Sequence, residues 1–117
     1  MSELSIEVRQ VGGGIAEVKA VGYLDAVTFE KMEKVIATLF SKGCYKLICN
    51  LEGVEYISSA GAGVFLGSVD TAQEHQGNIV LLRPSKEVQD IFDILGLVEI
   101  FPYAQTLDEA RKFFVKA

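Results

Sequence analysis

The sequence contains no tryptophan, one histidine, two prolines and two cysteines. One histidine and one cysteine pair are poor material for a metal site, so we expect neither a metal ion nor a cofactor. Cys44 and Cys49 lie on either side of the start of a predicted strand. We interpret both as reduced thiols, with Cys49 in the core.

Basic clusters and long apolar runs are also missing. Eleven basic and sixteen acidic side chains give a net charge of −5, without a block of lysine or arginine that could neutralise several phosphates. We therefore expect no direct binding of nucleic acid. A membrane helix needs about 18 apolar residues in a row, and no run approaches that length. Because residues 1–4 also lack the features of a signal peptide, we expect a cytoplasmic protein that does not bind a membrane.

The first 21 residues predict a β-hairpin. Leu4, Ile6 and Val8 alternate with polar neighbours, and the stretch 15–21 resumes a strand-like pattern rich in β-branched residues. The three glycines at 12–14 lie between these stretches. They are better explained as the turn of the hairpin than as a phosphate-binding loop.

Four later segments have the features of helices. The first follows Asp25, which we predict as its N-cap, and ends at Gly43 as a left-handed C-cap. The second spans about 59–76, the third opens at Pro84-Ser85, and a capping box at 106–109 starts the fourth. The predicted inward-facing positions are Met32, Val35, Ile36, Leu39 and Phe40, then Val88, Ile91, Phe92 and Leu95, then Leu107, Ala110 and Phe114.

Short apolar runs predict buried strands at 46–50 and 78–82, and a short edge strand at 99–101. Residues 51–57 are expected to lead from the first of these strands to the next helix. The alternation of strands and helices predicts an α/β fold, with a mixed sheet of four to five strands that opens with a hairpin and packs against about four helices. At 117 residues, half of them hydrophobic, the chain is expected to form a single domain over residues 1–117.

The most informative stretch is 55–66, where a predicted helix begins with two serines. A hydroxyl at this position can cap free backbone N–H groups, and a phosphate added there would meet the positive end of the helix dipole. Gly61, Gly63 and Gly67 lower the intrinsic stability of this helix. Either a neighbouring element packs closely on them, or they keep the surface low for a partner.

Enzymatic roles for this stretch find little support in the sequence. A serine hydrolase needs a base near its nucleophile and a G-x-S-x-G elbow, and neither is present. The only histidine, His75, lies roughly 24 Å along the same predicted helix at 1.5 Å per residue, and we expect it to be solvated. The glycines match neither dinucleotide-binding nor P-loop motifs. Asp25, Glu52 and Glu55 could form a carboxylate pair, although capping and solvation explain them as well.

Two segments resemble the STAS family of anti-sigma factor antagonists, and most of all its free-standing bacterial members. Residues 22–25 (GYLD) are similar to the family's G-x-L/I-D, and residues 57–63 (ISSAGAG) are similar to its D-S-S/T-G-x-G segment. The segments 83–85 (RPS) and 94–97 (ILGL) give further matches. The resemblance covers nearly the whole chain and implies the STAS fold.

The resemblance also implies a binding module rather than an enzyme. A family member of this kind binds an anti-sigma factor that is also a serine kinase, phosphorylation breaks the complex, and a serine phosphatase restores it. Ser59 is similar in position to the family's phosphoacceptor. Ser58 stands where the family usually has Asp and is the alternative acceptor. The implied partner-binding residues are Asp25, Tyr23, Ser58, Ser59, Ala60, Gly61 and Gly63.

Two other functions stay open at this point. The chain could be a STAS-fold adaptor or scaffold subunit that phosphorylation does not regulate, or a small-molecule-binding domain or minor hydrolase built around Ser59. The latter needs a concave pocket with a perturbed acid or base. Tyr23, Leu24, Val54 and Tyr56 could belong to a partner surface or to the core.

Overall fold

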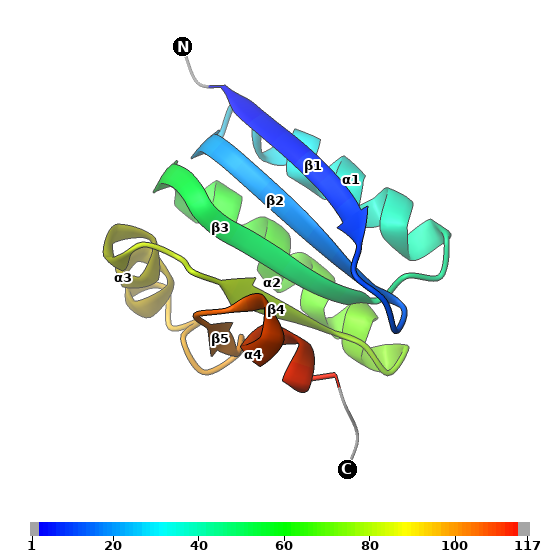
Figure 1. Cartoon of the computed structure of the whole chain (residues 1–117). Coiled ribbons are helices and arrows are strands. Elements are labelled where there is room, and N and C mark those ends of the chain that lie inside the picture. The colour runs from blue at the N-terminus through cyan, green and yellow to red at the C-terminus, as the bar shows by residue number, and fades with distance from the viewer. Residues whose placement is uncertain (1–2, 115–117) are drawn as a thin grey trace.

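A computed structural model describes residues 3–114 and contains a five-stranded mixed sheet (Figure 1). The order across the sheet is the order along the chain, from β1 to β5. β1 pairs antiparallel with β2, and every later pair is parallel. This confirms the predicted mixed sheet and its opening hairpin. The strands are β1 (Leu4–Gln10), β2 (Ile15–Leu24), β3 (Lys46–Ile57), β4 (Asn78–Leu82) and β5 (Tyr103–Ala104).

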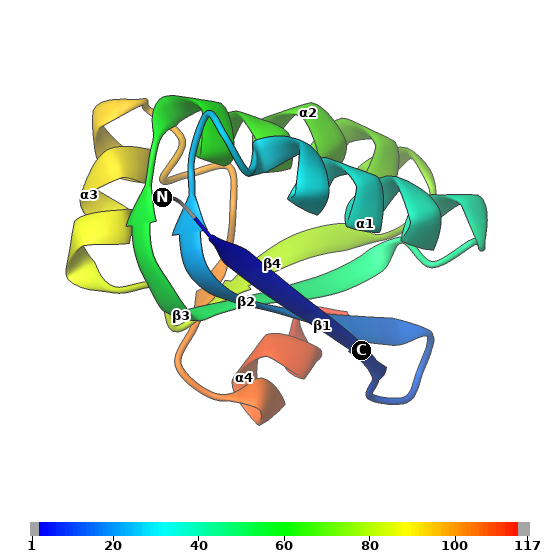
Figure 2. The same ribbon diagram turned by 90° about the horizontal axis from the view of Figure 1, so that it is seen from above.

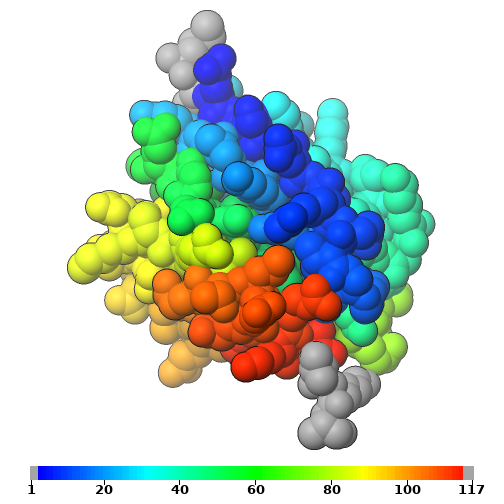
Figure 3. Space-filling model, viewed as in Figure 1, coloured from blue at the N-terminus to red at the C-terminus, as the bar shows by residue number. Residues whose placement is uncertain are grey.

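The helices cover the two faces of the sheet unequally. α1 (Phe29–Ser41), α2 (Ser59–Glu74) and α3 (Lys86–Ile94) pack on one face, whereas α4 (Leu107–Lys112) packs on the other (Figure 2). Figure 3 shows that α4 and the turn before it cover only part of the second face, so that strand surface remains open above them. Within residues 3–114, no helix has both the length and the hydropathy to span a bilayer.

Two apolar clusters hold these layers together. The larger one joins α1, α2 and α3 to alternate side chains of the strands, including Val18, Cys49 and Leu81. The smaller one lies under α4 and includes Ile48 and Val80. Because successive side chains of a strand point to opposite faces, each central strand supplies both clusters.

β3 is longer than the sequence predicts. Residues 51–57, which were expected to form a connecting loop, continue the strand to Ile57. Leu51, Val54 and Ile57 remain buried, but the register against β2 shifts twice on the way. The register shifts break the simple alternation of apolar and polar residues, which explains why the pattern did not predict a strand.

The last strand is misplaced in the sequence prediction. Residues 99–101 form a turn, and β5 begins after Pro102, whose carbonyl accepts a hydrogen bond from Leu81 N–H at 3.0 Å. Phe101 is buried because it anchors this turn in the core, not because it belongs to a strand. Leu95 was expected to face the core, but it is the C-cap of α3 and is 39% exposed.

Candidate functional site

Ser58 and Ser59 have different roles at the start of α2. Ser58 is the N-cap, with extended backbone angles, and its Oγ accepts a hydrogen bond from Gly61 N–H at 3.2 Å. The N–H of Ser58 donates to the carbonyl of Leu24 at 3.0 Å. The carboxyl end of β2 therefore fixes the position of the cap, and the Ser58 hydroxyl is occupied within the fold.

Ser59 is the first residue of α2, and its side chain is exposed. Within residues 3–114, the hydroxyl of Ser59 has no hydrogen-bond partner. Unpaired backbone N–H groups and the positive end of the helix dipole lie at this turn, and both favour a negative group. The hydroxyl of Ser59 can therefore be reached from solvent and can be modified without breaking a contact.

The three glycines of α2 do not share one purpose. A Cβ atom on Gly61 would lie 2.4 Å from the carbonyl oxygen of Leu24, so this glycine lets the first turn pack on the end of β2. Gly63 and Gly67 have open space where a Cβ atom would be, and both are exposed. The close-packing explanation thus applies to Gly61, and the other two leave the outer surface of α2 low.

Asp25 organises the turn before α1, but it is not the N-cap of that helix. Its Oδ1 accepts hydrogen bonds from the N–H groups of Val27 at 2.9 Å and Thr28 at 3.3 Å. The N-cap of α1 is Thr28, whose hydroxyl donates to the carbonyl of Tyr23 at 2.7 Å. The predicted helix start was too early because Asp25 first closes a turn of its own.

An exposed aromatic pair lies close to the serines along the sheet. Tyr23 and Tyr56 are register partners across β2 and β3, with ring centroids 6.4 Å apart. They are 42% and 49% exposed, whereas Leu24 and Val54 are buried. Tyr23 and Tyr56 are therefore exposed at the surface, whereas Leu24 and Val54 belong to the core.

Two further exposed apolar side chains were missed. Val27 is 77% exposed on the turn that Asp25 closes, and nothing in the sequence pattern distinguishes it. Leu66 is 43% exposed on α2. It follows Ser59 by seven residues, so helical spacing places both on one face and could have identified it.

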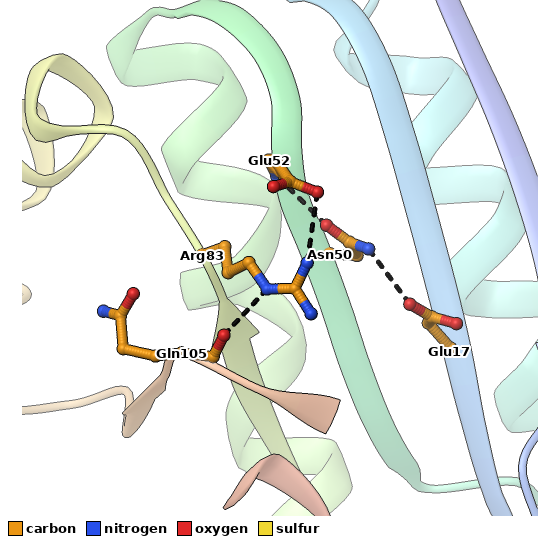
Figure 4. A network of polar contacts seen from close by, with 5 residues as sticks. All are labelled: Glu17, Asn50, Glu52, Arg83 and Gln105. Carbon is orange, nitrogen blue, oxygen red and sulfur yellow. Dashed lines mark hydrogen bonds and ion pairs between the residues drawn. The ribbon is translucent and has the colours of Figure 1, made fainter. Parts of the chain in front are cut away.

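The three acidic residues that could have formed a pair have different surroundings. Glu52 forms an ion pair with Arg83 at 3.2 Å, and Asp25 accepts a hydrogen bond from the N–H of Val27 in its own turn. Glu55 is exposed. Arg83 also donates to the carbonyl of Gln105 at 2.7 Å, which ties β3 to the segment before α4 (Figure 4).

A polar network crosses the open face of the sheet. Glu17 is buried and accepts hydrogen bonds from Arg9 and from the amide of Asn50, the latter at 3.0 Å. Burial alone would raise the pKa of Glu17, but these two hydrogen bonds and the charge of Arg9 outweigh it and lower the pKa below 4.5. A groove of about 670 Å³ runs over this network, and neither Ser58 nor Ser59 lines it. The perturbed acid is thus separate from the serines.

Other reactive groups also lie away from Ser59. His75 is exposed, as expected, but its ring stacks on Tyr45 at a centroid distance of 4.0 Å. Burial raises the pKa of the Cys49 thiol to about 12, so it stays protonated. Within residues 3–114, no group of three histidine, cysteine, aspartate or glutamate residues is placed to hold a metal ion.

Comparisons with known proteins point to one family. A family model described as the STAS domain matches residues 5–110. An anti-sigma-B factor antagonist from Staphylococcus epidermidis is 32% identical over 84 residues, which are 72% of this chain and 78% of the relative.

Two solved structures show the same fold in two phosphorylation states of one protein. The anti-sigma factor antagonist SpoIIAA in its unphosphorylated form gives a TM-score of 0.80 at 26% identity, covering 97% of this chain and 100% of that chain. SpoIIAA of Bacillus in its phosphorylated form gives a TM-score of 0.73 at 25% identity, covering 95% and 100%.

Proposed function

The chain belongs to the STAS domain family and is an anti-sigma factor antagonist, and from this premise we propose that phosphorylation of Ser59 controls its binding. In this proposal the unphosphorylated protein binds an anti-sigma factor that is also a serine kinase. The kinase transfers the γ-phosphoryl group of ATP to Ser59 Oγ, with release of ADP and of the hydroxyl proton. A serine phosphatase hydrolyses the ester and restores binding.

The difference between the two serines is the observation on which the choice of Ser59 rests. The hydroxyl of Ser58 accepts from Gly61 N–H, so a phosphate there would replace the helix cap. Ser59 is exposed, and its hydroxyl makes no hydrogen bond with any residue in 3–114. Modification of Ser59 therefore costs the fold least, which supports it over the alternative acceptor.

The surroundings of Ser59 explain how a phosphate would act on a partner and not on the fold. On the same face of α2, Gly63 has no side chain and Leu66 is an exposed apolar residue. A phosphate adds about −1.5 to −2 charges and a bulky tetrahedral group to this surface. The start of α2 tolerates that charge, because it meets the positive end of the helix dipole. A partner that has covered the same surface would lose contact and would have to desolvate the phosphate.

The proposal is tested by phosphorylation and binding in parallel. We expect incubation with the cognate anti-sigma kinase and ATP to place phosphate on Ser59, as mapped by mass spectrometry. Ser59→Ala should abolish this modification, and Ser59→Asp should weaken binding of the anti-sigma factor. Ser68→Ala is the matched control, because Ser68 lies on the same helix but its hydroxyl donates to the Val64 carbonyl at 2.8 Å.

Two outcomes would contradict it. Phosphate on Ser58 would move the switch to the helix cap. Equal binding by wild type, Ser59→Ala and Ser59→Asp, with no phosphate on either serine, would instead favour an adaptor that phosphorylation does not regulate.

A further inference from the structure

β1 is an edge strand, and within residues 3–114 no other strand pairs with its outer side. Tyr23 N–H donates to the Glu3 carbonyl at 2.8 Å, so the odd-numbered residues of β1 direct their backbone groups toward β2. The even-numbered residues Ile6, Val8 and Gln10 therefore turn their N–H and C=O groups away from the sheet. Such an edge can accept another extended segment as a further strand.

An apolar groove runs beside this edge, between β1 and α1. It has a volume of about 280 Å³, and Val8, Val35 and Leu39 line it together with Lys34, Thr38 and Lys42. Val8 is 43% exposed there, although it sits in the middle of the strand. An edge strand that only needs protection from aggregation would not place an exposed valine beside an apolar groove.

The rim of the groove is basic. Lys34 of α1 and Lys42, the C-cap of α1, line it, and Lys31 of α1 contacts the start of β1, where its Nζ donates to the Leu4 carbonyl at 2.5 Å. All three are exposed, and within residues 3–114 none forms an ion pair with a carboxylate. This row of positive charge contrasts with a chain whose net charge is −5.

We propose that the β1 edge and the adjoining face of α1, here called the β1–α1 groove, bind an extended acidic segment of another protein by strand addition. The segment pairs with the backbone of Ile6, Val8 and Gln10. It places one apolar side chain in the groove beside Val8 and acidic side chains two residues before and after it, toward the lysines.

The spacing of the charges matches an extended chain. Lys34 and the C-cap residue Lys42 are eight residues apart, which corresponds to about 12 Å at the helical rise of 1.5 Å per residue. Acidic residues four positions apart in a strand are separated by about 13 Å at 3.3 Å per residue. A second copy of this chain fits less well, because pairing two β1 edges would bring the lysine rows of both copies together.

The test uses a synthetic peptide, acetyl-Thr-Glu-Thr-Val-Thr-Glu-Thr-amide, and a matched peptide with lysine at both glutamate positions. We expect the acidic peptide to slow hydrogen exchange of the Ile6, Val8 and Gln10 amides and to bind about tenfold more tightly than the lysine peptide in NMR titrations. The paired change Lys34→Glu and Lys42→Glu should reverse this preference. The control is Lys86→Glu with Lys112→Glu, which changes the net charge equally on α3 and α4 and should leave the preference intact.

Three results would overturn the proposal: no shifts with either peptide, equal affinity for both, or protection of the β1 amides that rises with protein concentration alone. The third would identify a second copy as the occupant. The groove is independent of the proposed switch, so Ser59→Asp should leave peptide affinity unchanged even though it weakens binding of the anti-sigma factor.

Discussion

Ser58 and Ser59 show how neighbouring residues of one type can have unlike roles. One hydroxyl completes the hydrogen bonding of a helix start, and the other projects into solvent. The sequence predicts both at the beginning of a helix, because glycines and apolar spacing locate that boundary within a residue or two. It does not predict which serine is the cap, since this depends on the bond from Ser58 N–H to Leu24, a contact with a distant strand.

Substitution of Ser58 should separate capping from signalling. We expect Ser58→Ala to lower the free energy of unfolding by about 1 kcal/mol, because Gly61 N–H loses its acceptor. Ser58→Asp should be close to wild type, because aspartate caps equally well and its charge suits the helix start. Urea unfolding measures both. If Ser58→Ala and Ser58→Asp were equally destabilised, the cap would not be the role of this side chain.

Asp25 shows the same limit of sequence reasoning at a second residue. Aspartate before an amphipathic stretch is typical of an N-cap, and the amphipathic stretch itself was correctly placed. The structure inserts a turn closed by Asp25 and gives the cap position to Thr28. Both arrangements satisfy the same backbone N–H groups, so local chemistry alone does not decide between them.

At the scale of the element, α2 joins a packed first turn to an open outer face. Gly61 contacts the end of β2, whereas Gly63 and Gly67 face solvent. The helix gives up intrinsic stability at both kinds of position. Only at Gly61 does a contact between elements require the glycine.

Two glycine substitutions should therefore have opposite effects on stability. Gly61→Ala should lower the free energy of unfolding by about 2 kcal/mol, because its Cβ would meet the Leu24 carbonyl at 2.4 Å. Gly63→Ala should raise it by about 0.5–1 kcal/mol, since the methyl group enters open space within a helix. Thermal and urea unfolding would show this, and a loss of stability in Gly63→Ala would contradict it. Gly63→Ala should also weaken binding of the anti-sigma factor despite its greater stability.

The elements that were predicted most accurately from the sequence are those with an uninterrupted spacing of apolar residues. The hairpin, the helices and β4 follow simple spacing, and their predicted positions agree with the structure to within a few residues. The errors lie where tertiary contacts break the pattern. The second half of β3 shifts register against β2, and Phe101 is buried in the core although it lies in a turn. Neither property is encoded in local periodicity.

At the scale of the whole molecule, a charged network spans three strands on the face opposite α1 and α2. Glu17 of β2 binds Arg9 of β1 and Asn50 of β3, so one buried carboxylate ties the hairpin to the parallel part of the sheet. No sequence motif marks this network, because its members are separated along the chain and meet only when the strands pair.

The network should make stability depend on pH. The pKa of Glu17 is lower in the folded protein than its ordinary value of 4.5. The ionised carboxylate therefore contributes stability that is fully present above about pH 4.5 and is lost as the pH falls through the folded-state pKa. We expect Glu17→Gln to be less stable than wild type at neutral pH, with a difference that shrinks in acid.

Urea unfolding of both proteins across the acidic range would measure this difference. Glu99→Gln serves as the control, because it removes the same charge from an exposed turn outside the network. A constant difference between Glu17→Gln and wild type at every pH would mean that packing, and not ionisation, accounts for the role of Glu17.

The order of the strands across the sheet has a consequence for how the molecule is made. Each strand lies beside the one synthesised just before it, so no later segment has to be threaded between two earlier ones. A sheet of this kind can be completed from one side while the chain leaves the ribosome. β2 and β3, the two strands that support the start of α2, both precede Ser59 in the chain, so the residues beneath this helix start are synthesised before the helix itself.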